Sequence, residues 1–509
     1  MSGFPEPVVE FLRGEPTPEQ WRAISWPLEP CVVVAGAGSG KTSVMAGRVI
    51  YLAMVATGAL DADHPGVMPG NVLCLTFTNK ATENLMIRIR RALRTLELEE
   101  GEEPEIVNYH AFAAQVLERH GMLIGLEPGV RILGQAQRAE IAARVLDRMT
   151  FEDQHTRWQP TLVQYILSLD EQLANHLVEP ETVIEHVEGK LDVLRRAKSE
   201  EPLRAAIERI EIARAVRIFR ELKAELGVID FGDQIAHAVR IATAHPEVCD
   251  AYRERFGAVL LDEYQDTNHA QAELMRAVFG GGHPVTAVGD PDQNVYAWRG
   301  ASLRNLLQFP HAFRTAEGSE SARLPLYTNF RSGARILSAA DRVIEELPDA
   351  QRPDPDKVLR PWGPNGTGAV EVAQYEHEIS EAEGVAERLG RLHEGGTAWR
   401  DCAVLCRTHR LFEPLQLAFT ERGIPAEFVN LAGLIHLPEI VEVLAYARAA
   451  EDPSDGVALA RILTGPRYRV GLRDLARVAA WSRRETHAFL HVLKELELPE
   501  DEDLLEDHP

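Results

Sequence analysis

Residues 31–42 read Cys-Val-Val-Val-Ala-Gly-Ala-Gly-Ser-Gly-Lys-Thr, and the expected fold depends on this stretch. The apolar run 31–34 predicts a short buried strand. A glycine-rich turn follows, and then a helix whose apolar positions include Val44 and Val49. Such a turn directs backbone N–H groups and the positive end of a helix at one point, which suits a polyphosphate. We therefore expect a nucleoside triphosphate site; the alternative is a flexible turn between a strand and a helix.

The residue types of this loop assign roles within the expected site. Lys41 is expected to reach the β- and γ-phosphates, and the Thr42 hydroxyl to hold Mg²⁺. The strict loop pattern has glycine where this chain has Ala35. The expected nucleotide-binding residues of the loop are Ala35, Gly36, Ala37, Gly38, Ser39, Gly40, Lys41, Thr42 and Ser43.

Residues 258–266, Ala-Val-Leu-Leu-Asp-Glu-Tyr-Gln-Asp, supply acids for the same chemistry. An apolar strand here places Asp262 and Glu263 at its carboxyl end, where open α/β sheets bind ligands. Asp262 is expected to hold Mg²⁺ through water, and Glu263 to orient and deprotonate the attacking water. The alternative is a strand that happens to end in acids.

The composition limits the class of protein. A chain of 509 residues is long enough for about three or four domains. Its five scattered cysteines indicate reduced thiols, and we expect a cytoplasmic protein, nucleoid-associated if bacterial. No apolar run approaches about 18 residues, so we expect neither a secretion signal nor a membrane span. The net charge of −24 is only weak evidence against nucleic-acid binding, because phosphate contacts depend on local charge.

Glutamine and arginine side chains near these stretches are further candidates for the nucleotide site. Thr17 predicts a helix start, which gives Gln20 an amide able to read a purine edge; a surface glutamine is the alternative. Gln293 follows an expected strand at 284–289 and is a candidate sensor of the γ-phosphate. Arg331 is a candidate arginine finger.

Aromatic and basic side chains follow the expected strands and are candidates for DNA binding. Phe77, after a strand at 72–75, is either a core residue or a stacking platform for a base. Trp298 is either packed in a core or stacked on unpaired bases beside an arginine. The helix after Phe77 carries a basic face that is either solvated or in contact with phosphates, made of Arg88, Arg90, Arg91 and Arg94. The candidates for DNA contact are Phe77, Thr78, Asn79, Tyr296, Trp298 and Arg299.

The composition of the sequence changes between these motifs and predicts mainly helices. Residues 107–112 predict a strand-like run that ends in polar and aromatic groups. Residues 113–225 are rich in Ala, Glu, Arg, Leu and Ile at helical spacing and predict an all-helical insertion. Gly227 is a plausible C-terminal stop for its last helix. Asp230 and Asp233 then suit the first turn of the next helix.

The order and the sequences of these runs resemble the UvrD/PcrA/Rep family of superfamily 1 helicases, from about Thr17 to Gly471. The family often has alanine at the first loop position, as at Ala35. The resemblance implies an α/β fold of RecA-like P-loop parallel sheets flanked by helices, with all-helical insertion domains. The runs that carry it are AGAGSGKT (35–42), LTFTNKA (75–81), LLDEYQD (260–266), VGDPDQNVYAWRGA (288–301), TNFRS (328–332) and AVLCRT (403–408).

The resemblance also implies roles in the nucleotide site. Gln20 matches the adenine-reading glutamine, and Arg331 the first arginine finger. Phe330 stands where the family usually has a tyrosine stacked on adenine, and it keeps the ring without the hydroxyl. The phosphate ligand, the Mg²⁺ ligands and the catalytic base of the family match Lys41, Thr42, Asp262 and Glu263.

Further matches concern DNA. Gln293 resembles the residue that couples the γ-phosphate to the DNA groove, and Trp298 the residue that stacks on a DNA base. Phe77 and His110 lie in the family's other strand-contacting motifs.

The family also implies a division into domains. The first RecA-like domain is expected at 1–112 and 226–322, interrupted by the helical insertion at 113–225. A partial second RecA-like domain is expected at 323–436, with 401–408 as one of its strands. The start of a second helical insertion is expected at 437–495, and an acidic tail at 496–509.

One departure from the family qualifies the expected function. The family continues with a run of the form His-x-x-Lys-Gly-Leu-Glu and a second arginine finger, and neither occurs in this sequence. The leading hypothesis is an ATP- and Mg²⁺-dependent 3′ to 5′ translocase and helicase on single-stranded and partially duplex DNA, in repair, replication or recombination. The alternative is a nucleotide-gated half-motor that needs another DNA-repair protein or a complementing half. A subunit of a helicase–nuclease is weaker, since the sequence has no nuclease-type acid cluster.

Overall fold

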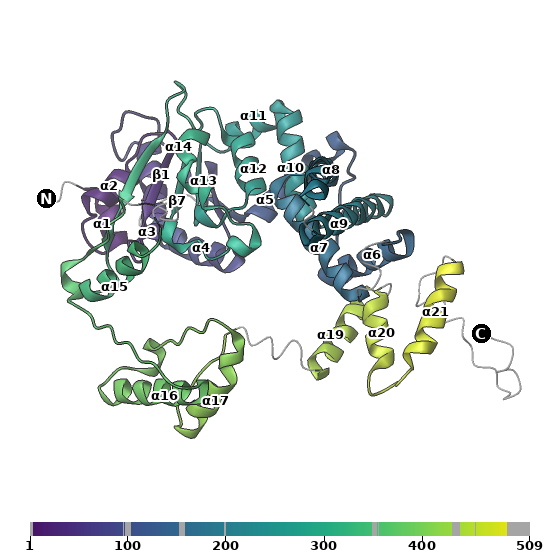
Figure 1. The fold of residues 1–509 in the computed structure, drawn as a ribbon. Coiled ribbons are helices and arrows are strands. Elements are labelled where there is room, and N and C mark those ends of the chain that lie inside the picture. The colour runs from purple at the N-terminus through teal and green to yellow at the C-terminus, as the bar shows by residue number, and fades with distance from the viewer. Residues whose placement is uncertain are drawn as a thin grey trace, which may run out of the picture. The chain divides into compact units, whose positions relative to one another are not determined.

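The computed structural model describes residues 4–94, 96, 103–151, 158–197, 200–348, 354, 356–429, 438–452 and 455–485. The chain divides into two compact units, Met1–Val370 and Glu371–Pro509. The first unit contains the large sheet and a long helical insertion (Figure 1).

The first unit is built on a six-stranded parallel sheet with the strand order β3-β2-β6-β7-β1-β8. In the register, Val33 pairs with Val288 and Leu324, and Leu75 pairs with Leu261. The central strands are apolar runs buried on both faces, as expected for a parallel sheet covered by helices. Because the strands are parallel, the loops that follow them meet at one edge. The strands are β1 (Cys31–Ala35), β2 (Val72–Thr76), β3 (Glu105–Asn108), β6 (Ala258–Leu261), β7 (Val285–Gly289) and β8 (Ala322–Leu326).

Helices cover both faces of this sheet (Figure 1). Alternate residues of β1 point to the two faces: Cys31 and Val33 join one core, and Val32 and Val34 join the other. The first face is covered by α1 (Glu6–Leu12), α2 (Pro18–Ile24), α3 (Lys41–Ala56) and α4 (Asn79–Leu93). The second face is covered by α5 (Tyr109–His120), α10 (Phe231–Ala244), α11 (Pro246–Arg255), α12 (His269–Phe279), α13 (Leu303–Leu307) and α14 (Phe309–Ala312). The predicted α/β class with a parallel sheet is confirmed.

A helical insertion interrupts the sheet between β3 and β6. A short parallel pair, β4 (Arg131–Ile132) and β5 (Val228–Ile229), closes its base. Gly227, after the last helix, has a left-handed φ of 62°, and the Asp230 carboxylate caps the next helix by accepting from the N–H groups of Gly232 and Asp233. Both local predictions are confirmed. The helices are α6 (Gln135–Arg148), α7 (Gln159–His176), α8 (Pro180–Arg196) and α9 (Glu200–Glu225).

A buried ion cluster joins this insertion to the sheet-covering helix α10. The ammonium of Lys223 lies 3.4 Å from Asp170, 3.0 Å from Asp230 and 2.8 Å from Asp233. Burial opposes the charge of Lys223, but the three carboxylates outweigh it and raise the lysine pKa. Such a cluster is costly to break, because its remaining charges would be buried without partners.

Three expectations differ from the structure. The strand expected at 107–112 ends at Asn108, because the Asn108 side chain accepts from the Ala111 N–H and starts α5 instead. No strand forms at 401–408, where Leu405 is 97% exposed. The boundary expected between 322 and 323 falls inside β8, which pairs with β1 and so belongs to the first sheet.

The chain after β8 returns over the sheet edge before it enters the second unit. It forms β9 (Thr328–Asn329), α15 (Ala334–Glu345) and β10 (Arg360–Pro361), and β9 and β10 pair in parallel. The second unit contains α16 (Glu378–Glu394), α17 (Phe412–Glu421), α19 (Pro438–Glu451), α20 (Gly456–Thr464) and α21 (Leu472–Glu485). The acidic tail expected at 496–509, and residues 430–437, lie outside the described residues.

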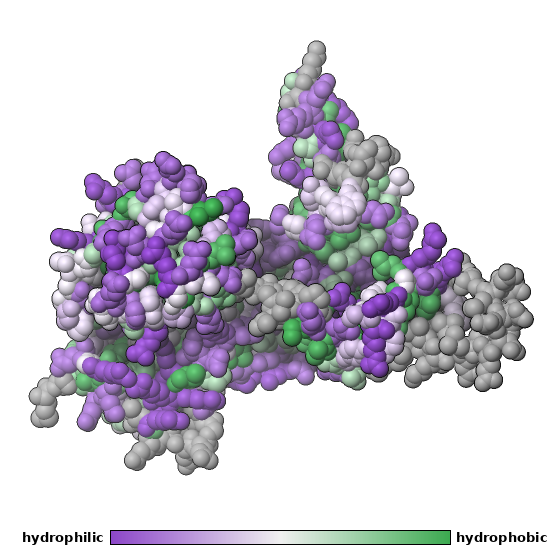
Figure 2. Space-filling view, turned by 90° about the horizontal axis from the view of Figure 1, so that it is seen from below, coloured by the Kyte–Doolittle hydropathy of each residue, from purple (hydrophilic) through white to green (hydrophobic). Residues whose placement is uncertain are grey.

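Hydrophilic side chains dominate the face seen in Figure 2, with apolar patches scattered among them. Within the described part of the chain, no helix combines the length and apolarity needed to cross a membrane.

Candidate active site

The loop between β1 and α3 has the geometry of a phosphate-binding loop. Gly38 and Gly40 adopt left-handed φ values of 71° and 88°, which other residues rarely adopt. The Ser39 hydroxyl donates to the Gly36 carbonyl at 2.8 Å and tightens the turn. Gly40 is the N-cap of α3 and offers no side chain, so the first N–H groups of this helix have no capping side chain. An anion is the natural partner of such a helix end.

Lys41 and Glu263 connect this loop to the end of β6. The Lys41 Nζ donates to Oε2 of Glu263 at 2.8 Å, and the Gln265 Nε2 donates to the same oxygen at 2.9 Å. Glu263 itself has a left-handed φ of 46°, an uncommon conformation for a residue with a side chain. Strained backbone of this kind clusters at functional sites.

Asp262 lies beneath this ion pair at the carboxyl end of β6. Its N–H donates to the Leu75 carbonyl at 2.8 Å, and its Oδ1 accepts from the Glu263 N–H at 3.0 Å. Burial, and then the charge of Glu263, raise the pKa of Asp262 to about 6, while Lys41 acts in the opposite direction. The partly exposed Thr42 adds a hydroxyl on the first turn of α3. Carboxylate and hydroxyl oxygens are of the kind that Mg²⁺ takes as ligands, so the donor types of Asp262 and Thr42 fit this ion.

Gln20 reaches the phosphate-binding loop from α2. Its backbone and side chain form a capping box with Thr17, as the predicted helix start requires. The side chain is 7% exposed, and its Nε2 lies 3.2 Å from where a Cβ on Gly40 would stand. Arg48 of α3 holds the end of α2 by donating to the carbonyl oxygens of Ile24, Trp26 and Pro27. Gln20 is therefore fixed beside the loop and is not a free surface side chain.

The turn at 328–332 packs directly on the same loop. The Asn329 Nδ2 donates to the Ala37 carbonyl, and the Phe330 N–H donates to the Gly38 carbonyl at 2.9 Å. A Cβ on Gly38 would meet the Arg331 Cβ at 2.6 Å. Phe330 and Arg331 are thus held at the loop by backbone contacts.

Gln293 lies further along the sheet edge, after β7. Its Nε2 donates to Oδ2 of Asp290 at 2.6 Å, and the Asp290 N–H donates to Oε1 of Gln265 at 3.0 Å. Gln265, which contacts Glu263, therefore connects Gln293 to the ion pair through Asp290. The described contacts link Gln293 to the site indirectly.

Aromatic side chains gather on the loop that follows Gln293. The rings of Phe77 and Tyr296 lie 5.0 Å apart, and those of Tyr296 and Trp298 lie 6.5 Å apart. The Arg299 guanidinium lies 4.5 Å from the Trp298 ring. Trp298 is 73% exposed, which excludes the core alternative in this structure. We call Phe77, Tyr296, Trp298 and Arg299 the aromatic cluster.

The other candidates for DNA contact, Thr78, Asn79 and His110, differ in their contacts. Thr78 caps α4, and the Asn79 Oδ1 accepts from the Asn108 side chain at 2.6 Å. His110 is stacked edge-on against Phe231 at 5.6 Å, and burial lowers its pKa. The basic face of α4 is exposed, and Arg90 on it pairs with Glu103.

The sequence assigns no role to several side chains that lie in this region of the structure. Gln265 lies in the run LLDEYQD, and Asn329 lies directly before Phe330 in the run TNFRS. Lys357, Leu359 and Trp362 lie in no motif. Leu359 would collide with a Cβ on Gly36, and the Trp362 ring lies 5.6 Å from that of Phe330. The return of the chain over the sheet edge brings Leu359 to the phosphate-binding loop, Trp362 to Phe330 and Lys357 to the loop after β7.

A parallel sheet with a glycine-rich loop and a lysine after β1, and paired acids after β6, defines the class of P-loop nucleotide-binding proteins. A profile described as the UvrD/REP helicase N-terminal domain matches residues 16–314, and one described as the UvrD-like helicase C-terminal domain matches residues 324–497. The chain belongs to the UvrD/REP helicase family.

Curated relatives agree with this family. The chain is 32% identical over 495 residues to ATP-dependent DNA helicase UvrD1 of Mycobacterium tuberculosis (strain ATCC 25618 / H37Rv), covering 95% of this chain and 58% of that protein. It is 27% identical over 483 residues to ATP-dependent DNA helicase PcrA of Bacillus subtilis (strain 168), covering 94% and 59%. Among the curated relatives that match, including these two, the chain spans 58% to 60% of the relative's own length.

Proposed function

We propose that this chain is an ATP-driven translocase that moves 3′ to 5′ along single-stranded DNA and separates the partner strand of a partial duplex. The observation that carries the proposal is the 2.8 Å contact between Lys41 and Glu263, directly beside the buried Asp262. Family membership supports DNA as the substrate, since the matched relatives are named ATP-dependent DNA helicases. A cytoplasmic place in DNA repair, replication or recombination belongs to the same proposal.

The proposed catalytic steps use residues of one sheet edge. Lys41 and the first N–H groups of α3 would hold the phosphates, and Thr42, together with Asp262 through water, would hold Mg²⁺. A bound Mg²⁺ neutralises charge that develops on the phosphates during transfer. Glu263 orients the attacking water and accepts its proton, and Arg331 stabilises the transition state.

Further residues are proposed to recognise the adenine of ATP and to connect the γ-phosphate to the DNA. Gln20 reads the adenine edge, and Phe330 stacks on its face. Gln293 senses the γ-phosphate through Asp290. The aromatic cluster binds unpaired bases by stacking, and Thr78, Asn79 and His110 add further contacts to the DNA.

The domain division also stays a proposal. The first RecA-like domain is formed by residues 1–112 and 226–326, up to the end of β8. Residues 113–225 form the insertion, 327–436 a second RecA-like domain, 437–495 a second insertion and 496–509 an acidic tail. Nucleotide binding and hydrolysis would close and reopen the two RecA-like domains on each other.

Single-strand-stimulated ATP hydrolysis tests the proposal. We expect oligonucleotide to stimulate turnover by this chain, and K41A and E263A to abolish turnover while some DNA binding remains. The exposed Glu247 offers a matched control, E247A, which should behave as the wild type. Undiminished hydrolysis in either site variant would remove the assignment. A fluorescent duplex assay then separates a motor, which unwinds, from a nucleotide-gated half-motor, which hydrolyses ATP without strand separation.

A further inference from the structure

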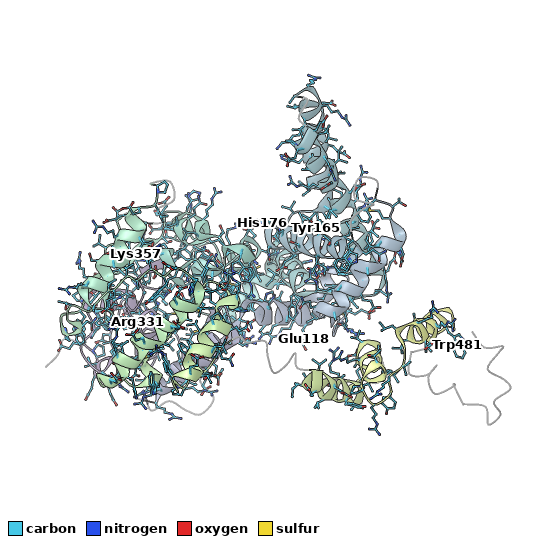
Figure 3. All side chains as sticks on the ribbon, turned by 60° about the horizontal axis from the view of Figure 1, so that its bottom comes forward. Glu118, Tyr165, His176, Arg331, Lys357 and Trp481 are labelled. Atoms are coloured by element: carbon cyan, nitrogen blue, oxygen red, sulfur yellow. The ribbon has the colours of Figure 1, made fainter. Side chains whose placement is uncertain are left out.

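Lys357 is a buried cation that the roles above leave unused. It lies on the segment before β10, and Figure 3 labels it on the sheet-bearing part of the first unit together with Arg331, whereas Tyr165 and His176 mark the insertion. Only 3% of its side chain is exposed. The ammonium pairs with Asp290 and, at 2.5 Å, with Asp292. Lysines are rarely buried unless they are paired, so these contacts fix the side chain.

Asp290 is also the end of a hydrogen-bond chain that begins in the nucleotide site. Oε2 of Glu263 accepts from Lys41 at 2.8 Å and from the Gln265 amide at 2.9 Å. The other end of the Gln265 amide accepts from the Asp290 N–H at 3.0 Å. One side chain, Gln265, therefore connects the proposed catalytic base to Asp290.

The carboxylate of Asp290 continues this chain toward the aromatic cluster. Oδ2 accepts from the Gln293 amide at 2.6 Å, and Oδ1 accepts from the Asp292 N–H at 3.1 Å. Asn294 is tied back by donating to the Gln265 carbonyl at 3.0 Å. Because the loop at 290–294 is held at these points, the position of Asp290 sets where the aromatic cluster begins.

We propose that Lys357 is a positioning residue that couples the nucleotide site to the aromatic cluster. By pairing with Asp290 and Asp292 it keeps the loop after β7 in one arrangement, with Gln265 on Glu263 and Gln293 on Asp290. The proposal rests on the proposed ATPase and DNA-binding function and adds a residue through which the two are connected. A change at the phosphates that moves Glu263 is transmitted along this network to the bases.

The coupling is measured as a ratio of DNA affinities. The dissociation constant of a fluorescent oligothymidine is determined for the whole chain without nucleotide and with Mg²⁺ and a non-hydrolysable ATP analogue. We expect the wild-type affinity to change by about fivefold or more between the two conditions, a usual size for coupling between sites. In K357M the two affinities should agree within about twofold. Retention of the wild-type ratio in K357M overturns the proposal.

Two further variants separate coupling from simple charge neutralisation. Arg360 lies on the same segment with an exposed side chain, and R360M should keep the wild-type ratio. K357M/D290N removes the ammonium and its buried partner Asp290, and leaves only the partly exposed Asp292 charged, so it should fold if K357M is unstable. If the double variant shows the wild-type ratio, Lys357 is only a counter-charge and the proposal fails. Loss of the ratio in the double variant, with R360M unaffected, supports it.

The outcome for the proposed function remains distinguishable. ATP hydrolysis that survives K41A contradicts the proposed nucleotide site. Hydrolysis that is lost in K41A, together with a wild-type ratio in K357M, contradicts only the coupling role of Lys357.

Discussion

The ammonium of Lys41 and the carboxylate of Glu263 meet at 2.8 Å and join the loop after β1 to the loop after β6. The Lys41 side chain is 11% exposed and that of Glu263 is 33% exposed, so the ammonium is largely buried while the carboxylate stays partly open to water. A phosphate that reaches Lys41 must compete with Glu263 for the ammonium. The pair therefore links phosphate binding to the position of the proposed base.

Removing each charge of this pair should have opposite effects on nucleotide affinity. In E263Q a negative charge near the phosphates is lost, so a fluorescent ATP analogue should bind at least as tightly as to the wild type. Turnover should fall by about 10²–10⁴-fold because the general base is gone. In K41M both affinity and turnover should fall. Equilibrium titration and a phosphate-release assay measure the two quantities, and wild-type turnover in E263Q would contradict the role of Glu263.

The ring of Phe330 should matter for ATP binding, and the hydroxyl group that a tyrosine would add should not. F330A should raise the KM for ATP by about tenfold, since stacking on a base is worth about 1–3 kcal/mol. The value of kcat at saturating ATP should change little. F330Y, which keeps the ring, is the matched variant and should stay within about twofold of the wild type. Steady-state kinetics over a range of ATP concentrations give both constants; an unchanged KM in F330A would show that the ring does not contact the base.

The elements that could be predicted from the sequence are those with local signals. The apolar run 31–34 followed by glycines predicts a strand and a loop because both depend on residues close in the chain. The same holds for Thr17 and Asp230, whose side chains cap helices within three residues. Lys41 and Glu263 can be expected at one nucleotide site from the sequence, because the carboxyl ends of strands in an open α/β sheet bind ligands at one edge, but their direct contact is not predicted.

The contacts that could not be predicted join residues without a shared pattern. Asn329 contacts Ala37, and Lys357 contacts Asp290. These contacts arise because the chain after β8 turns back over the sheet edge, and no hydrophobic pattern in the sequence predicts this turn. At 401–408 the sequence predicts a strand that the structure does not contain. The apolar residues of this segment favour a strand, but a strand forms only where a neighbouring strand pairs with it. Tertiary context decides these cases.

The buried Lys223 should be essential for the stability of the first unit. K223M leaves Asp170 and Asp230, each 1% exposed, with fewer counter-charges. Breaking a buried pair in this way costs about 3–5 kcal/mol. The exposed Arg217–Glu221 pair is a matched control, and E221Q should change stability by less than about 0.5 kcal/mol. Urea unfolding followed by circular dichroism compares the variants; equal stability of K223M and the wild type would contradict the role of the cluster.

Acidification should destabilise the fold through His283. Burial lowers the pKa of His283 to about 4, and its ring stacks on Phe279 at 5.4 Å. The unfolded chain binds a proton at this histidine below about pH 6.5, whereas the folded chain does not until about pH 4, so stability falls as the pH drops between these values. Between pH 7 and pH 5 this loss should be about 1–2 kcal/mol after allowance for partial exposure.

The variant H283Q should remove this part of the acid sensitivity. The exposed His311 gives a matched control, H311Q, which should lose stability on acidification as the wild type does. Urea midpoints at the two pH values decide the matter. Identical pH dependence in H283Q and the wild type would show that His283 does not carry the effect.

Trp298 should carry a large part of the affinity for single strands. It is 73% exposed beside Tyr296 and under the Arg299 guanidinium, so a base can stack on it without displacing a protein contact from a core. W298A should weaken oligothymidine binding by about 5- to 100-fold, the range expected for one stacked base. ATP hydrolysis measured without DNA should be much less affected, since Trp298 makes no described contact with Lys41 or Glu263.

The equally exposed Trp158 on the insertion is the matched control, and W158A should bind DNA as the wild type does. Equal losses in the two variants would indicate a general effect of removing an exposed ring, and a loss confined to W298A places the DNA bases on the aromatic cluster.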